Sequence, residues 1–270
     1  MRIIILMENS GIDNGCVAEH GLSVYVETEK HKLLLDTGAS DRTWQNAGKL
    51  GVDLSTVDTL VLSHGHYDHS GGILSFRHRN PDAKIYMQQT ATKEFYHDER
   101  YIGIDPGIKD LPGILFLQGD YQIDQELSIF TNIKGRRFWP QSNLLLSVME
   151  DGIRKQDQFC HEQCLVISSE GKHILISGCA HNGILNILDR YQEIYQDLPD
   201  YVITGFHMMK KTDYTEEEIA VVQATARELK ESKTIFYSGH CTGGKAMRLM
   251  KPILGEQLVQ MYSGMEIEIS

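Results

Sequence analysis

The segment SHGHYDHSGG at residues 63–72 constrains this chain more than any other feature, because it places three histidines and an aspartate within six consecutive positions. The preceding residues, 59–62, read TLVL, an apolar run typical of a buried strand. The sequence therefore predicts a turn at the end of a strand that carries four side chains able to bind a cation: His64, His66, Asp68 and His69.

Imidazole nitrogen and carboxylate oxygen are both common ligands of zinc, at about 2.0–2.2 Å. In a tight turn after a strand, His64 and His66 can share one cation, while Asp68 and His69 point to a neighbouring one. Two cations roughly 3.5–4 Å apart can polarise an electrophile and generate hydroxide near neutral pH. The segment therefore predicts a metal centre; the alternative is a merely polar loop.

Three further histidines follow strand signals. His181 comes after HILIS at 173–177, His207 after YVIT at 201–204, and His240 after TIFYS at 234–238. Residues 215–229 predict a helix, with a capping box from Thr215 to Glu218 and an apolar stripe, so that 201–238 form a βαβ unit. The strands of such a unit are usually parallel, so His207 and His240 are expected at one edge of a sheet, where α/β sheets place their sites.

The rest of the chain predicts strands at 2–7, 22–27 and 32–35, a helix near 41–50, and a second helix after His181 with an apolar face from Ile184 to Tyr195. Residues 97–119 hold two of the six prolines and four glycines, which favours an irregular excursion or lid over a domain boundary. We therefore predict a single domain spanning 1–270, with a lid or insertion within about 77–158.

Composition limits the partners. A net charge of -11 argues against a nucleic-acid surface, and the apolar run at 3–7 is too short for a signal segment or a membrane span. Five cysteines in no regular framework fit a reducing, cytoplasmic compartment. We expect a small-molecule substrate. A cationic and aromatic patch, Lys134 to Trp139, is interpreted either as a lid over a planar phosphorylated ligand or as a solvated loop. Nothing identifies an interface between subunits.

The segment HGHYDH matches the HxHxDH motif of the metallo-β-lactamase superfamily, which the chain resembles. EHGLSVYVE, LLLDTGAS, SGCAHNGI, TGFHM and SGHCTGG are similar, in order, to the branch named after 7,8-dihydropterin-6-methyl-4-(β-D-ribofuranosyl)aminobenzene 5'-phosphate synthase. The resemblance implies an α/β (α+β) protein with an αββα sandwich and a dinuclear site between the edges of two sheets. It also implies two ligand sets: His64, His66 and His181 for the first metal, and Asp68, His69 and His240 for the second.

The resemblance leaves four residues with open roles. Asp36 would orient a ligand histidine or be an ordinary turn residue, and His207 would contact substrate or phosphate or be structural. Superfamily hydrolases commonly carry an aspartate that bridges both metals, whereas the comparable turn here reads Gly178-Cys179. Cys179 is thus either a thiolate ligand or a small core residue, and Cys241 raises the same question.

Two other patterns are interpreted as structural. The segment CHEQC at 160–164 looks like a metal site but has no second cysteine pair, so it is interpreted as the entry to a strand. Five isolated histidines are interpreted as surface residues or as core residues with hydrogen-bond partners: His20, His31, His78, His97 and His173.

These observations predict a metal-dependent hydrolase that attacks a phosphoester, ester or amide with metal-activated water. Asp68 would orient the nucleophile or take its proton, and His207 would stabilise developing oxyanion charge. Zinc is the expected metal, as one or two ions, with manganese and iron as alternatives. Two other functions remain open: a transferase that condenses an aminobenzoate- or pterin-type acceptor with a phosphoribosyl donor, and a non-catalytic protein that binds its ligand with the help of a metal.

Overall fold

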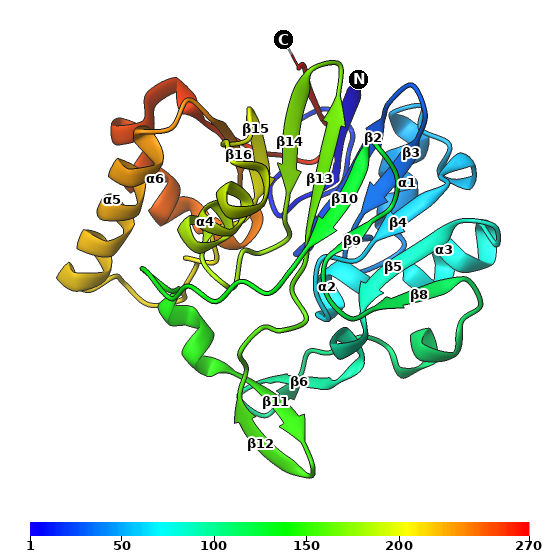
Figure 1. Cartoon of the computed structure of the whole chain (residues 1–270), viewed down its shortest axis with the longest axis horizontal. Helices are drawn as coiled ribbons and strands as arrows, with labels where there is room; N and C mark the ends of the chain where they lie inside the picture. The colour runs from blue at the N-terminus through cyan, green and yellow to red at the C-terminus, as the bar shows by residue number, and fades with distance from the viewer. Residues whose placement is uncertain (270) are drawn as a thin grey trace.

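The computed structural model describes residues 1–269, and two seven-stranded sheets lie face to face at its centre (Figure 1). In spatial order, the first sheet contains β18 (Met265–Ile267), β1 (Arg2–Met7), β2 (Ser23–Glu27), β3 (Lys32–Leu35), β4 (Thr59–Val61), β5 (Lys84–Gln88) and β8 (Ile114–Leu117). The second contains β17 (Leu258–Gln260), β16 (Ile235–Ser238), β15 (Tyr201–Thr204), β14 (Lys172–Ile176), β13 (Cys164–Ser169), β10 (Leu127–Phe130) and β9 (Tyr121–Gln122).

Each sheet has a parallel part and an antiparallel part. In the first sheet β3, β4, β5 and β8 run parallel, and in the second β14, β15, β16 and β17 do. The predicted βαβ unit is confirmed, because α5 (Glu216–Lys230) connects β15 to β16 and begins with the capping box of Thr215 and Glu218. Parallel strands end at a common edge, so each sheet presents several strand ends together.

Helices cover the outer face of each sheet (Figure 1). The longer helices beside the first sheet are α1 (Arg42–Lys49) and α3 (Ile73–Arg79), and those beside the second are α4 (Ile184–Tyr195), α5 and α6 (Gly243–Leu254). Separate apolar clusters fill the space between the sheets and the space under each helical layer. The arrangement is the αββα sandwich that the resemblance to the metallo-β-lactamase superfamily implies.

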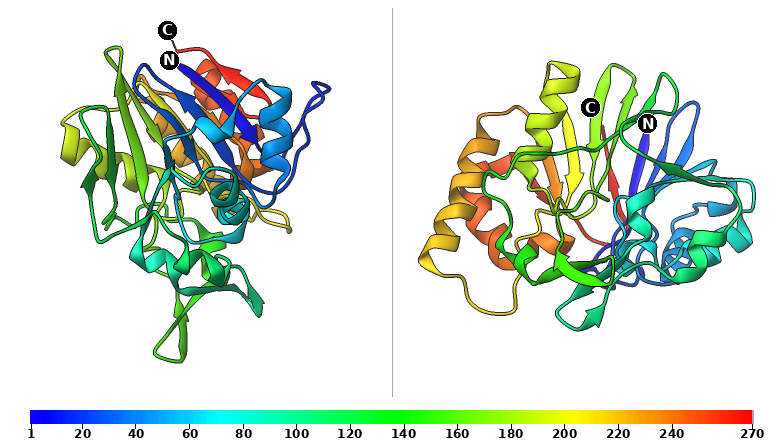
Figure 2. Two further views of the ribbon diagram at one scale, coloured as in Figure 1. Left: turned by 90° about the vertical axis from the view of Figure 1, so that its right-hand side faces the viewer. Right: turned by 60° about the horizontal axis from the view of Figure 1, so that its bottom comes forward.

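A smaller four-stranded sheet lies at one end of the sandwich (Figures 1 and 2). It contains β12 (Ile153–Gln156), β11 (Leu146–Glu150), β6 (Glu94–His97) and β7 (Arg100–Tyr101). Its own apolar cluster includes Phe95, Leu146 and Phe159. The prediction of an irregular segment over 97–119 is wrong for β8, because the apolar residues 114–117 pair in parallel with β5 and extend the first sheet.

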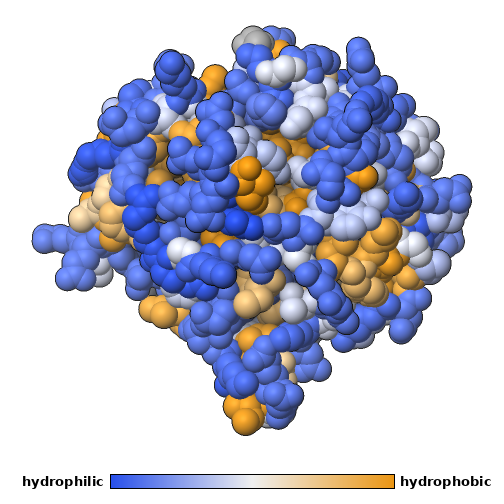
Figure 3. Space-filling model, viewed as in Figure 1, coloured by the Kyte–Doolittle hydropathy of each residue, from blue (hydrophilic) through white to orange (hydrophobic). Residues whose placement is uncertain are grey.

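Short elements complete the chain. They are α2 (Tyr67–Ser70), η1 (Leu54–Thr56), η2 (Gln89–Thr92), η3 (Pro106–Asp110), η4 (Gln141–Leu145), η5 (His240–Thr242) and η6 (Gly255–Gln257). Within residues 1–269, no helix combines the length and the apolar character needed to cross a membrane. The face seen in Figure 3 is mostly hydrophilic, with an apolar spot at the tip of the β11–β12 hairpin, where Ile153 is exposed.

Candidate metal centre

The candidate site is built from turns at the carboxyl ends of strands in both sheets. The four-residue histidine and aspartate motif follows β4, while His181 follows β14, His207 follows β15 and His240 follows β16. Four non-glycine residues in the turns that form the site have positive φ: Asp36 (60°), Ala180 (54°), His207 (49°) and His240 (45°). Such conformations are disfavoured for residues with a Cβ and gather at functional sites.

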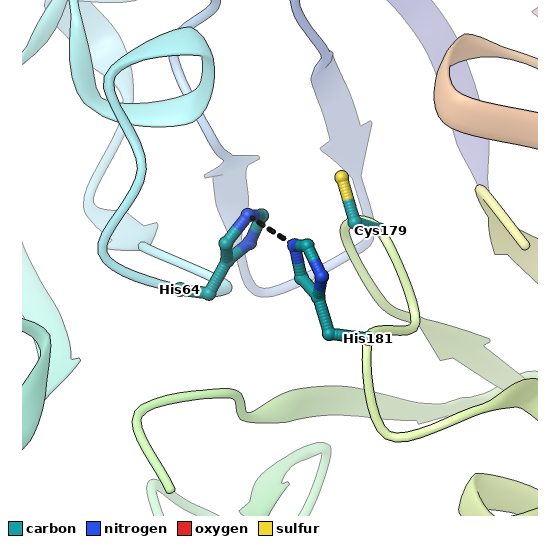
Figure 4. Close-up of side chains that lie close together, drawn as sticks. All are labelled: His64, Cys179 and His181. Atoms are coloured by element: carbon teal, nitrogen blue, oxygen red, sulfur yellow. Dashed lines mark hydrogen bonds between the residues drawn. The ribbon is translucent and has the colours of Figure 1, made fainter. Parts of the chain in front are cut away.

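Two pairs of histidines face each other across the gap between the sheets. Nε2 of His64 lies 3.3 Å from Nε2 of His181, and Nε2 of His69 lies 3.1 Å from Nε2 of His240. Figure 4 shows His64 entering from one side, and His181 entering from the turn that also carries Cys179. Two nitrogen ligands of a tetrahedral zinc ion are about 3.3 Å apart, given bonds of about 2.0–2.1 Å. Both pairs therefore have the spacing of ligands that share a cation.

Hydrogen bonds at the other ring nitrogen assign the tautomers of the two histidines from the first sheet. Nδ1 of His69 lies 2.6 Å from Oδ2 of Asp36 and donates its proton to that carboxylate. The hydroxyl of Ser63 donates to the same Asp36 oxygen, at 2.6 Å, so its own oxygen accepts from Nδ1 of His64, at 2.8 Å. Both histidines thus carry the proton on Nδ1 and present an Nε2 lone pair.

The histidines from the second sheet are oriented by asparagines. Oδ1 of Asn143 lies 3.0 Å from Nδ1 of His181, and the Asn143 amide is fixed because its Nδ2 donates to the His181 carbonyl at 2.7 Å. Oδ1 of Asn9 accepts from Nδ1 of His240 at 2.8 Å, and Nδ2 of Asn9 donates to the His240 carbonyl at 3.3 Å. Oxygen acceptors at Nδ1 are the usual outer partners of metal-binding histidines.

This network fits a divalent cation. Where both imidazoles of a pair are neutral, their Nε2 lone pairs face one another and repel unless a cation lies between them. Nε2 of His66 is buried and has no hydrogen-bond partner among residues 1–269. Burial lowers the pKa of His64 and His181 well below the usual value and that of His66 to about 3. These imidazoles are therefore neutral at pH 7, which is the state that binds a metal.

Asp68 lies within reach of the second histidine pair. Its Oδ2 is 3.6 Å from Nε2 of His69 and 3.4 Å from Nε2 of His240. Burial raises the pKa of Asp68, but the surrounding imidazoles outweigh burial and hold it below the usual value. Burial in turn lowers the pKa of His240, but the hydrogen bond to Asp68 raises it to about 9. In the chain without a cation, His240 therefore carries a second proton, which a cation would replace.

His66 lies beside both rings of the first pair, with ring centroids 4.6 Å from His64 and 4.9 Å from His181. A ligand atom of His66 also lies within 4.8 Å of those of Asp157 and His161. His161 donates from Nε2 to Asp157 at 3.0 Å and accepts at Nδ1 from the backbone N–H between His64 and His66, at 2.9 Å. His161 therefore holds the motif turn, although the sequence indicated only a strand entry here.

Glu162 anchors the turn that carries His181. It is fully buried and accepts from the backbone N–H groups of His181 at 2.6 Å and Asn182 at 2.9 Å, and from the Asn182 side chain at 2.8 Å. Burial raises the pKa of Glu162 despite these donors. The neighbouring Cys164 begins β13, as the strand-entry interpretation expects.

His20 borders the site, although the sequence showed it as an isolated histidine. It is at the surface, but its Nε2 lies 3.3 Å from Oδ2 of Asp68 and its ring stacks on His240 with centroids 5.1 Å apart. His207 lies beside the first histidine pair, and its ring centroid is 4.0 Å from that of His181. The Nδ1 atom of His207 is buried and without a hydrogen-bond partner within 1–269, so it is available to a ligand.

The two cysteines with open roles both lie at the site. Sγ of Cys179 is 3.2 Å from Nε2 of His69, and burial raises the pKa of its thiol. Cys241 directs its sulfur to the backbone oxygen of Cys179, at 3.4 Å.

The arginines of the cationic patch have partners within the protein. Arg137 is paired with Asp189 at 3.0 Å and with Glu228, and Arg136 donates to the side-chain oxygen of Asn182 at 3.1 Å.

Comparison with known proteins shows the family of the chain. The sequence profile of the metallo-β-lactamase superfamily matches residues 17–227, and the chain belongs to that superfamily. It is similar to a crystal structure described as a metal-dependent hydrolase of the β-lactamase superfamily, with a TM-score of 0.84 and 30% identity over 100% of this chain and 99% of the other.

Two curated relatives come from Methanocaldococcus jannaschii. An uncharacterised protein is 28% identical over 91% of this chain and 92% of its own length. The 7,8-dihydropterin-6-methyl-4-(β-D-ribofuranosyl)-aminobenzene-5'-phosphate synthase is 26% identical over 98% of this chain and 95% of its own. The similarity to both relatives therefore spans nearly the whole chain.

Proposed function

We propose that this chain is a metal-dependent hydrolase of phosphoester, ester or amide bonds in a small molecule, and that it holds two cations. The observation that carries the proposal is the pair of facing Nε2 atoms, 3.3 Å apart at His64 and His181 and 3.1 Å apart at His69 and His240, each on a histidine whose Nδ1 proton has an oxygen acceptor. Such pairs are poor contacts for neutral imidazoles and good ligand sets for zinc.

The proposed ligands are those of the two sets implied by the sequence. His64, His66 and His181 would hold one cation, and Asp68, His69 and His240 would hold the other. Divalent cations in such a site lower the pKa of a water molecule and polarise an acyl or phosphoryl group. The nitrogen and oxygen donors suit zinc, with manganese and iron as alternatives.

The surrounding residues position these ligands and the substrate. Asp36, Asn143 and Asn9 fix the rings through Nδ1, while Glu162 and His161 fix the two turns. Asp68, which also contacts His20, orients the attacking water or takes its proton. His207, whose Nδ1 is unpaired, faces the substrate and stabilises negative charge that develops on it.

The test combines metal content with hydrolysis. Protein purified without chelator or metal-affinity resin should contain about two equivalents of metal, measured by mass spectrometry, and should hydrolyse at least one member of a panel of phosphodiesters and esters. Asp68→Asn should lower the rate by about 10²-fold or more, whereas Asp213→Asn, at an exposed position, should not change it. A fully active Asp68→Asn protein would contradict the assigned role.

A second candidate follows from the similarity to the synthase over nearly the whole of both chains. In this second function the chain would condense an aromatic acceptor of the aminobenzoate or pterin type with a phosphoribosyl donor that carries a diphosphate, and the residues of the metal site would hold the diphosphate that leaves. Release of pyrophosphate that requires the aromatic acceptor would favour this reaction. Hydrolysis without any acceptor would favour the hydrolase.

A further inference from the structure

One donor atom belongs to both histidine pairs. The sulfur of Cys179 and the ligand nitrogens of His64 and His181 all lie within 4.8 Å of one another, and the same holds for Cys179 with His69 and His240. Among residues 1–269, Cys179 is the one His, Cys, Asp or Glu side chain that these two groups share. The sulfur therefore lies near the ligand nitrogens of both histidine pairs, and it contacts Nε2 of His69 at 3.2 Å.

The surroundings of Cys179 are polar, although it is buried to 3% exposure. It belongs to none of the apolar clusters, whereas Cys164 packs into the cluster over the second sheet. Its sulfur lies 3.2 Å from Nε2 of His69, which presents a lone pair because Asp36 takes the Nδ1 proton. The sulfur is thus in contact with a proposed ligand nitrogen and lies outside the apolar clusters.

We propose that Cys179 is a sulfur ligand shared by the two cations of the site, an inference that rests on the proposed function. On binding, the thiol loses its proton to solvent and the sulfur bonds to both cations. A sulfur at about 2.3 Å and a nitrogen at about 2.0–2.1 Å on one tetrahedral zinc ion are about 3.5 Å apart, close to the Cys179 to His69 contact.

A shared thiolate also sets the choice of metal. Thiolate ligands favour zinc and similar borderline metals, whereas carboxylate and water favour manganese and magnesium. The donor set of this chain, with one carboxylate, one sulfur and five imidazoles, should therefore select zinc or cobalt(II) over manganese. Cys179→Asp should shift that preference toward manganese, because it offers oxygen at the shared position.

Cobalt(II) provides the test, because a thiolate bound to cobalt(II) gives a charge-transfer absorption in the near ultraviolet. The metal-free protein loaded with cobalt(II) should show this band together with about two bound ions per chain. Cys179→Ser should abolish the band and weaken cobalt binding about 10- to 100-fold. Cys164→Ser, at an equally buried cysteine in the apolar cluster, should keep both the band and the affinity.

The outcomes separate this inference from the proposed function. Two bound cobalt ions without the band, or a band that persists in Cys179→Ser, would overturn the sulfur ligand while leaving the hydrolase proposal intact. If the band is lost in Cys241→Ser but kept in Cys179→Ser, Cys241 supplies the sulfur ligand. That result would also overturn the proposed role of Cys179. Failure of the unmodified protein to bind cobalt or zinc would overturn both.

A second measurement covers the case in which Cys179→Ser does not fold. X-ray absorption of the unmodified protein loaded with zinc should show a sulfur shell at about 2.3 Å beside the nitrogen and oxygen shell at about 2.0–2.1 Å. A shared sulfur gives about one sulfur per zinc ion, and a sulfur on one cation alone gives about one half. A spectrum without sulfur, or with about one half, would contradict the proposal.

Discussion

The carboxylate of Asp36 lies 2.6 Å from Nδ1 of His69, and both side chains are completely buried. Asp36 directly follows β3, and the turn that carries His69 follows the neighbouring strand β4, so the parallel pairing of these strands places the acceptor next to the ring. Asp36 also accepts from the Ser63 backbone N–H at 2.7 Å. One buried carboxylate therefore orients a proposed ligand and holds the start of the turn that carries it.

Replacing Asp36 with alanine should weaken zinc binding about 10- to 100-fold, because outer hydrogen-bond partners of ligand histidines have effects of that size. The measurement is competition for zinc with a chelator of known affinity. Asp53→Ala provides the control, since Asp53 is an exposed residue that caps a short helix by accepting from the Ser55 backbone N–H, and its loss should leave zinc affinity unchanged. Equal affinities in the two variants would contradict the positioning role.

Removing the metal should lower the melting temperature. The proposed ligands come from both sheets, so a bound cation links the two sheets. This ligand set exists only in the folded protein, and the cation therefore stabilises the folded state. A ligand present at 100 times its dissociation constant stabilises by about 2.7 kcal/mol. Calorimetry before and after chelation, with zinc restored in a third sample, measures the effect. An unchanged melting temperature after verified metal loss would exclude a structural link of this kind.

Glu162→Ala should destabilise the protein by about 2–5 kcal/mol, because it leaves two backbone N–H groups and the Asn182 amide buried without their acceptor. Glu162→Gln keeps one acceptor oxygen and should cost less. Glu193→Ala on the exposed side of α4 should change stability by no more than about 0.5 kcal/mol. Denaturant unfolding gives all three values, and similar results for Glu162→Ala and Glu193→Ala would refute the anchoring role.

His31 should make stability depend on pH. Its Nδ1 lies 2.9 Å from Asp58, before β4 of the first sheet, and its Nε2 lies 2.6 Å from Asp124, before β10 of the second. Burial lowers the pKa of His31, but the two carboxylates outweigh burial and raise it. A raised pKa stabilises the folded state fully below the unfolded value of about 6.5, and this contribution is lost as pH rises through the folded value.

The matching variant is His31→Gln. It should be less stable than the unmodified protein by about 0.5–1 kcal/mol at pH 6, because the pairs are partly exposed, and the difference should shrink towards pH 9. Exposed His78→Gln should show no such trend. Urea unfolding at a series of pH values measures both, and a difference that grows with pH would have the wrong sign.

Much of the fold and of the site follows from local patterns. The strand before His64, the βαβ unit that leads to His240 and the capping box at Thr215 are written in short stretches of residues with clear periodicity. Because parallel strands end together, the same patterns also predict that the distant turns converge. Asp36 comes instead from the resemblance, which left open whether it orients a ligand histidine or is an ordinary turn residue, and it directly follows the strand next to the motif strand.

The residues and strands that the sequence analysis did not predict lack a periodic pattern of this kind. Asn143 and Glu162 act through hydrogen bonds to distant turns, and an asparagine or glutamate with such a role looks like any other in the sequence. His20 reaches Asp68 from a loop whose path depends on tertiary packing. The small third sheet has strands of two to five residues, too short for alternation to stand out.

The division of the proposed ligands between two sheets also fixes an order of events during synthesis. A chain that is made from its N-terminal side presents the turn at 64–69 first, but His240 lies 171 residues beyond His69, so the donors are complete only after that stretch has been made. Until then the early turn offers only part of each ligand set. If the proposed ligands are the right ones, tight binding of the metal is therefore a late step, because it requires that the two sheets have already packed against each other.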